Sequence, residues 1–179
     1  MSPAQYMSMM VISGLACLAV PGCAPDKPEE SAEADAESLA QTGRDLMMGR
    51  GGLAPDAAKA RALFEKAARK GSGAAYFYWG LLANEPGTRA DVEEACGLFA
   101  QSAALNHPEG LRAYGECRFN GVDGTARDPG AAAELFRQSI SRGGVQAYAS
   151  LARLYTSGEG VPKDPAEAAR LMQKFREAN

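Results

Sequence analysis

Between residues 38 and 179, apolar side chains recur at the spacing of amphipathic α-helices. Within residues 59–68 the apolar positions are Ala60, Leu63, Phe64, Ala67 and Ala68. These positions follow one another at i, i+3, i+4, i+7 and i+8, which places them on one face of a helix. Residues 131–140 and 165–175 carry the same pattern. The body of the chain is therefore predicted to be helical throughout.

The helical pattern returns every 35 to 37 residues. Four aspartates precede its successive copies, namely Asp56, Asp91, Asp128 and Asp164. Large apolar residues keep the same spacing at Phe64, Phe99, Phe136 and Met172. A second series begins at Ser38, Ala75, Leu111 and Ala147. A period of this length is typical of helical repeat arrays. It predicts four helix pairs, which we place at residues 38–72, 73–108, 109–144 and 145–179.

Capping residues mark where the predicted helices begin and end. Each of the four aspartates stands at an expected N-cap, where a side-chain oxygen accepts from free backbone amides. Pro129 and Pro165 follow two of them at the favoured first helical position. Glycines mark the expected helix ends at Gly71, Gly143 and Gly144, and turns at residues 49–52, 121–124 and 158–160. A unit of this size cannot bury enough surface alone, so the units must stack into an all-α, αα-solenoid fold.

The fourth unit carries the most complete copy of this pattern, from Ala147 through Leu151, Tyr155, Gly158 and Gly160 to Asp164 and Ala168. It resembles the Sel1-like repeat, a relative of the tetratricopeptide repeat. The second unit departs most, because residues 84–89 are one residue shorter and lack the Gly-x-Gly-Val turn. The resemblance implies a solenoid that acts as a scaffold or adaptor rather than as an enzyme.

In related arrays the first helix of each pair lines a concave groove that holds a protein or peptide. The residues expected on that surface here are Arg44, Phe77, Leu81, Gln146, Ala149 and Arg153. An apolar centre with flanking arginines would suit an extended acidic peptide. The alternative is that these are ordinary solvent-facing side chains.

The N-terminus has the features of an export signal. Residues 9–20 are mostly apolar, over a length that suits a signal sequence and is short for a membrane span. Residues 20–23, Val-Pro-Gly-Cys, resemble a bacterial lipobox, which implies cleavage after residue 22 and lipidation of Cys23. Two features depart from that pattern. No Lys or Arg precedes the apolar run, and Pro21 is an unusual residue at its position. An ordinary cleaved signal and a retained anchor are the alternatives. Ala24 after the cysteine would fit the outer membrane, facing the periplasm.

Charge divides the chain into three parts. No charged side chain occurs before Asp26, whereas residues 26–37 contain six carboxylates and one lysine. The remaining residues hold 16 carboxylates and 18 basic side chains, so the net charge of −3 hides an acidic segment and a nearly neutral body. Residues 23–37 also lack large apolar side chains and are predicted to form a solvated tether. This charge gives no reason to expect nucleic-acid binding.

Few residues suggest catalysis or metal binding. His107 is the single histidine, which excludes a multi-histidine metal site, and its position at a turn predicts a solvated side chain. No nucleophile has an evident base, and the glycines of residues 49–52 are better explained as a turn than as a phosphate site. The sequence predicts no cofactor and no catalytic residue. Some cysteine-rich exported relatives are assigned β-lactam-binding or β-lactamase activity, which remains an alternative, as does a structural tether without a ligand.

Two further cysteines lie in the repeat body. Cys96 is placed on the second helix of unit two and Cys117 on the first helix of unit three, which should be neighbours. Export permits a disulfide, and some secreted members of the repeat family are stapled by cysteines. A bridge and two separate, small helical residues both remain open, because bridging requires close Cα atoms. The sequence as a whole predicts a non-enzymatic envelope lipoprotein that binds a protein or peptide.

Overall fold

A computed structural model describes residues 35–84, 89–122 and 126–179. Within these residues it contains α-helices and no β-strand, which confirms the all-α prediction. The helices are α1 (Ala36–Met48), α2 (Ala57–Arg69), α3 (Gly73–Ala83), α4 (Arg89–Ala104), α5 (Pro108–Asn120), α6 (Pro129–Ser141), α7 (Ala147–Ser157) and α8 (Pro165–Glu177).

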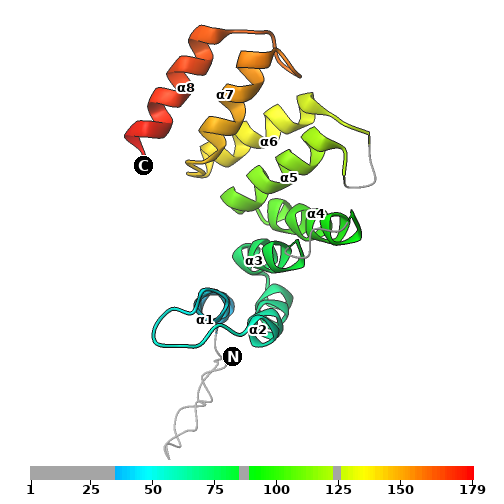
Figure 1. Ribbon diagram of the computed structural model, residues 1–179, viewed down its shortest axis with the longest axis vertical. Coiled ribbons are helices and arrows are strands. Elements are labelled where there is room, and N and C mark those ends of the chain that lie inside the picture. The colour runs from blue at the N-terminus through cyan, green and yellow to red at the C-terminus, as the bar shows by residue number, and fades with distance from the viewer. Residues whose placement is uncertain (1–34, 85–88, 123–125) are drawn as a thin grey trace, which may run out of the picture. The chain divides into compact units, whose positions relative to one another are not determined.

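The helices form four consecutive pairs, each stacked on the next along the chain from α1/α2 to α7/α8 (Figure 1). Alanine is the commonest residue at the buried positions, followed by leucine and phenylalanine, and Phe64 and Phe136 are fully enclosed. Small buried residues let the helix axes approach, and the aromatic rings fill the space between them. The core is therefore a row of clusters between neighbouring helices, as expected of a repeat array.

Side-chain caps start most of the helices. Asp56, Asp128 and Asp164 accept hydrogen bonds from backbone amides of α2, α6 and α8, as the sequence predicted. Asp91 is different, because α4 already begins at Arg89 and Asp91 lies in its first turn. The prediction of an N-cap at Asp91 was therefore wrong. The segment before this helix, residues 84–89, is one residue shorter in sequence than its counterparts in the other units. The spacing between aspartate and helix start in those units therefore does not apply to α4.

The ends of the second helices use left-handed backbone conformations. Gly71 and Gly143 have φ angles of 88° and 89°, and Asn106 takes the corresponding role in unit two with a φ of 58°. Asparagine is one of the few other residues that tolerate this region. Gly144 was expected to be left-handed and is not among the positive-φ residues. A glycine is required at this position for a steric reason, because a Cβ on residue 144 would clash with the Ser139 hydroxyl oxygen.

A glycine on the first helix of each of three units faces a phenylalanine on the second. A Cβ added to Gly43, Gly80 or Gly115 would lie 2.5–2.6 Å from a ring carbon of Phe64, Phe99 or Phe136, respectively. Gly43, Gly80 and Gly115 are therefore structurally equivalent. The repeat series that begins at Ser38, Ala75 and Leu111 instead pairs Gly115 with Thr42 and Trp79, each four residues later. That series places unit three one residue out of register. The contact with Phe136 corrects that alignment.

Candidate functional site: the odd-helix face

The first helices of the pairs share one continuous surface. Helix α1 contacts α3, α3 contacts α5, and α5 contacts α7, whereas the backbones of α2, α4, α6 and α8 do not approach one another in this way in the described chain. Helices α2 and α4 are linked by the long side chains of Arg61 and Glu94, 3.8 Å apart. Helices whose backbones approach in this way lie on the inside of a stacked array. We call the surface formed by α1, α3, α5 and α7 the odd-helix face. It is the counterpart of the predicted groove.

At its N-terminal end this face is polar. Arg44 on α1 donates a hydrogen bond to the hydroxyl of Tyr78 on α3 at 3.2 Å, and its guanidinium lies 5.7 Å from the centre of that ring. Gln41 accepts a second hydrogen bond from Arg44. A pocket of about 220 Å³ adjoins these side chains and is completed by Glu37, His107 and Glu109, among others. Arg44 is therefore held by its neighbours and not presented as a free cation.

His107 closes this pocket from the start of α5. Its Nδ1 accepts a hydrogen bond from the backbone amide of Gly110 at 3.3 Å, so the imidazole is the N-cap of the helix. Burial lowers the pKa of His107, and the nearby carboxylates of Glu109 and Glu37 only partly oppose that effect. The prediction of a solvated turn histidine was wrong. The side chain is only 21% exposed because it packs against the Phe77 ring, 5.7 Å away between ring centres.

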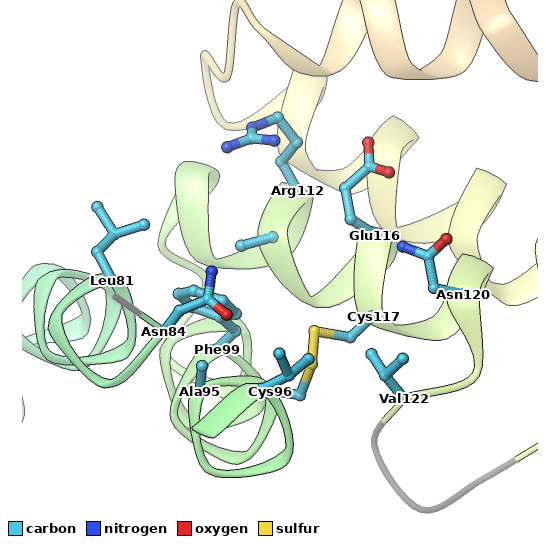
Figure 2. Close-up of a pocket in the computed structure, with 12 residues that line it drawn as sticks. Leu81, Asn84, Ala95, Cys96, Phe99, Arg112, Glu116, Cys117, Asn120 and Val122 are labelled. Atoms are coloured by element: carbon cyan, nitrogen blue, oxygen red, sulfur yellow. A yellow bond between two sulfur atoms is a disulfide. The ribbon is translucent and has the colours of Figure 1, made fainter. Parts of the chain in front are cut away.

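The centre of the molecule contains a second pocket of about 240 Å³ between α3, α4 and α5. Its lining includes Leu81, Phe99 and both cysteines. Cys96 on α4 and Cys117 on α5 form a disulfide, with Cα atoms 5.9 Å apart (Figure 2). The bridge covalently joins unit two to unit three. Of the two alternatives that the sequence left open, a bridge or two separate cysteines, the structure contains the bridge.

Phe77 does not lie on the odd-helix face, contrary to the sequence prediction. It is 7% exposed and belongs to a buried cluster with Phe99, Ala113 and the two cysteines. Leu81 lies one turn further along the same side of α3 and packs against this cluster, but it stays half-buried whereas Phe77 is covered. The apolar centre of the predicted groove is consequently reduced to Leu81, which lines the second pocket.

At the C-terminal end the face is held by a charged network. Arg153 on α7 pairs with Glu116 on α5 at 2.6 Å, and Ser150 donates to the same carboxylate at 2.7 Å. The Phe119 ring lies near two guanidinium groups, with Arg153 at 4.9 Å and Arg127 at 4.4 Å. Such contacts stabilise the packing of α7 on α5. Arg153, like Arg44, is thus engaged within the protein.

The remaining predicted groove residues, Gln146 and Ala149, both belong to the region of α7. Gln146 is exposed immediately before the helix, and Ala149 is half-buried. The structure therefore does not gather the six predicted residues into one site. It distributes five of them along the face and buries the sixth.

Sequence reasoning missed Arg112 and Glu116, the residues that unit three contributes. The glycine positions could have revealed Glu116. It directly follows Gly115, just as Arg44 follows Gly43 and Leu81 follows Gly80. Arg112 lies one helical turn before Glu116 and lines the second pocket. When Gly43, Gly80 and Gly115 are aligned by their contacts with phenylalanine, unit three contributes residues to the same face as units one and two.

The predicted export signal, the lipidation site Cys23 and almost all of the acidic tether lie outside the described residues. Within the described ranges, no helix is both long and apolar enough to cross a membrane. The same residues include no cluster of three His, Cys, Asp or Glu side chains suited to a metal ion.

These features define an all-helical repeat protein with one shared helix face. The sequence profile of the Sel1 repeat matches residues 36–72, 73–107, 108–144 and 145–179. The chain therefore belongs to the Sel1 repeat family, whose members generally act as scaffolds for protein–protein interaction.

Solved structures share this fold. A Sel1 repeat protein from Oxalobacter formigenes is similar with a TM-score of 0.72 and 24% sequence identity, over 85% of this chain and 62% of that one. The protein c5321, described as a protective antigen of uropathogenic Escherichia coli strains with an SLR fold, gives a TM-score of 0.67 and 28% identity. That match covers 80% of this chain and 30% of c5321. No curated protein matches the chain.

Proposed function

We propose that this protein is a non-enzymatic scaffold that binds a segment of another protein along the odd-helix face. The observation that carries the proposal is the continuity of that face across α1, α3, α5 and α7, whose residues also line two pockets. Half-buried side chains such as Leu81 and Tyr78 offer apolar and aromatic contact area beside hydrogen-bonding groups. This mixture is typical of protein interfaces.

A pair of leucine substitutions tests the binding face. Leu81→Arg places a charge on the odd-helix face, whereas Leu105→Arg makes the same change at an exposed leucine after α4. Tagged full-length protein is used to capture partners from envelope extract. We expect Leu81→Arg to lose partners that Leu105→Arg retains. An identical set of partners with both variants, at equal folded content by circular dichroism, would contradict the assignment of the face.

We further propose that the protein is exported and held on the envelope membrane by a lipid on Cys23, with residues 23–34 as an acidic spacer. Residues 36 and 37, which the sequence assigned to the tether, belong to α1. The apolar run of residues 9–20 followed by Pro-Gly-Cys supports this proposal. Several acyl chains together give a stable membrane anchor. In cells, Cys23→Ser should move the protein from the membrane fraction to the soluble fraction and abolish labelling by a fatty-acid analogue. Retention of the serine variant in the membrane would show that Cys23 is not the anchor.

A further inference from the structure

The central pocket has both apolar and polar walls, and its apolar wall contains an aromatic ring and the disulfide. Phe99, Ala113 and the disulfide line it from α4 and α5, with Leu81 on the α3 side (Figure 2). Its volume of about 240 Å³ exceeds the ~150 Å³ of an engineered apolar cavity that accommodates benzene. The pocket therefore has room for one large aliphatic or aromatic side chain.

Arg112 lies at the edge of this pocket, on the first turns of α5 (Figure 2). Its Nε is buried and makes no hydrogen bond within the described part of the chain. Among those same residues, no ion pair or hydrogen bond is found for the rest of its guanidinium. The Nε of Arg44 is likewise buried without a hydrogen bond, but the two Nη atoms of Arg44 are bonded to Tyr78 and Gln41. Arg153 is bonded to Glu116, so Arg112 differs from both in the terminal part of its guanidinium.

Neither carboxylate of α5 pairs with Arg112. Glu109 stands three residues before it, and its carboxylate lies 3.6 Å from the imidazole of His107. Glu116 stands one turn further along the helix, but its carboxylate is bonded to Arg153 and Ser150 on α7. In Figure 2 the Glu116 carboxylate and the Arg112 guanidinium point in different directions. A partly buried arginine without a carboxylate favours an anionic oxygen from outside, since a planar guanidinium binds a carboxylate through two parallel hydrogen bonds.

We propose that this pocket binds the C-terminal residue of a partner protein, with its large apolar side chain inside and its terminal carboxylate on Arg112. This inference rests on the scaffold function proposed above. A C-terminal residue is the simplest occupant, because its side chain and its carboxylate are attached to the same Cα atom. Asn84 and Asn120 also line the pocket and supply side-chain amides that can donate to and accept from the backbone of the bound residue.

The test uses two small probes that differ only in the terminal group, N-acetyl-Gly-Phe as the free acid and as the amide. Each is titrated into the full-length, oxidised protein and followed by NMR chemical shifts. The acid should bind at least about tenfold more tightly than the amide, because only the acid carries the charge that Arg112 recognises. Equal affinity of the two probes, or no binding of either at millimolar concentration, would overturn the proposal.

Variants locate the binding event. Arg112→Gln should reduce the affinity for the acid to that for the amide, whereas Arg176→Gln, at an exposed arginine of α8, should leave both unchanged. Ala113→Leu fills the base of the pocket and should weaken both probes. If Arg112→Gln binds the acid like the wild type, Arg112 is not the carboxylate site.

The outcome is separable from that of the scaffold proposal. Loss of partner capture in Leu81→Arg together with no probe binding would leave the odd-helix face in place and reject the pocket. Probe binding that depends on Arg112, together with partner capture unaffected by Leu81→Arg, would support the pocket and reject the extended face.

Discussion

The junction between units two and three differs from the junction between units three and four. At the first, a disulfide joins Cys96 on α4 to Cys117 on α5 beside a pocket of about 240 Å³. At the second, α7 is fixed to α5 by the Glu116–Arg153 ion pair and the contacts of Phe119. The junction between units two and three is thus covalently bridged and contains a pocket, whereas the junction between units three and four is held by an ion pair and by packing.

This difference shows how a repeat array can keep one open site. Each unit depends on its neighbours for burial, so an incompletely filled junction loses packing contacts and is a weak point of the array. A disulfide offsets such a loss by restricting the unfolded chain. The covalent bridge therefore allows the pocket and the unpaired Arg112 guanidinium to coexist with a stable stack.

The largest expected effect comes from removing the bridge with Cys96→Ala and Cys117→Ala together. The two cysteines are 21 residues apart in sequence. Closure of a loop of this length corresponds to about 3 kcal/mol in the chain-entropy treatment. Urea denaturation should show a loss of this order, and a reductant should destabilise the wild type but not the double variant. A wild type equally stable with and without the reductant would mean that packing alone holds this junction.

The next effect compares the interiors of units two and three. Gly80→Ala and Gly115→Ala would each drive a Cβ into a buried phenylalanine, Phe99 or Phe136, and should cost about 1–3 kcal/mol by overpacking. Gly97→Ala on α4 is the matched control, since a Cβ there meets no atom within 4 Å. It should be neutral or stabilise by up to about 1 kcal/mol.

Thermal unfolding of the three glycine variants then sharpens the comparison of the junctions. Similar losses for Gly80→Ala and Gly115→Ala would show that the two units pack alike internally. The difference between the junctions would then lie in the bridge and the pocket. A neutral Gly80→Ala would instead show that unit two is loosely packed throughout.

The ion pair at the second junction should contribute less. The Arg153 side chain is 52% exposed and that of Glu116 is 26% exposed, so solvent screens their attraction. A double-mutant cycle with Glu116→Gln and Arg153→Gln should give a coupling of about 0.2–1 kcal/mol that decreases with added salt. A coupling near zero would assign the stability of this junction to its apolar contacts.

The sequence predicted the fold class well because the signals involved are local. Helical periodicity, aspartate caps and the repeat period all follow from short stretches of chain, and the eight helices of the described ranges agree with them. The bridge could not be decided in the same way. The distance between Cys96 and Cys117 depends on how α4 packs against α5, which no local pattern specifies.

The binding face was predicted less well because of the register of unit three. Aligning Gly115 with Thr42 instead of Gly43 shifts that helix by one residue, which rotates every side chain by about 100°. Glu116, the equivalent of Arg44 and Leu81, was thereby left off the face. Arg112 is the equivalent of Phe77 in the glycine series, so its exposure could not be inferred from the series. Phe77 was assigned to the face for a related reason, since exposure was inferred without knowing which side of α3 meets α5.

The smallest expected effect concerns His107, at the polar end of the face. Burial lowers the pKa of this imidazole in the folded protein below its usual 6.5, and its role as an N-cap acceptor also requires the neutral form. The unfolded chain therefore binds the proton more readily. The stabilising contribution of the neutral side chain is complete above about pH 6.5 and is lost as the pH falls through the lowered pKa.

Melting temperatures between pH 7 and pH 5 measure this effect, in a range above the titration of most carboxylates. The wild type should become slightly less stable over this interval. His107→Asn retains a capping side chain without a titrating group and should show a smaller change. An unchanged pH dependence in His107→Asn would mean that other groups govern stability in this range.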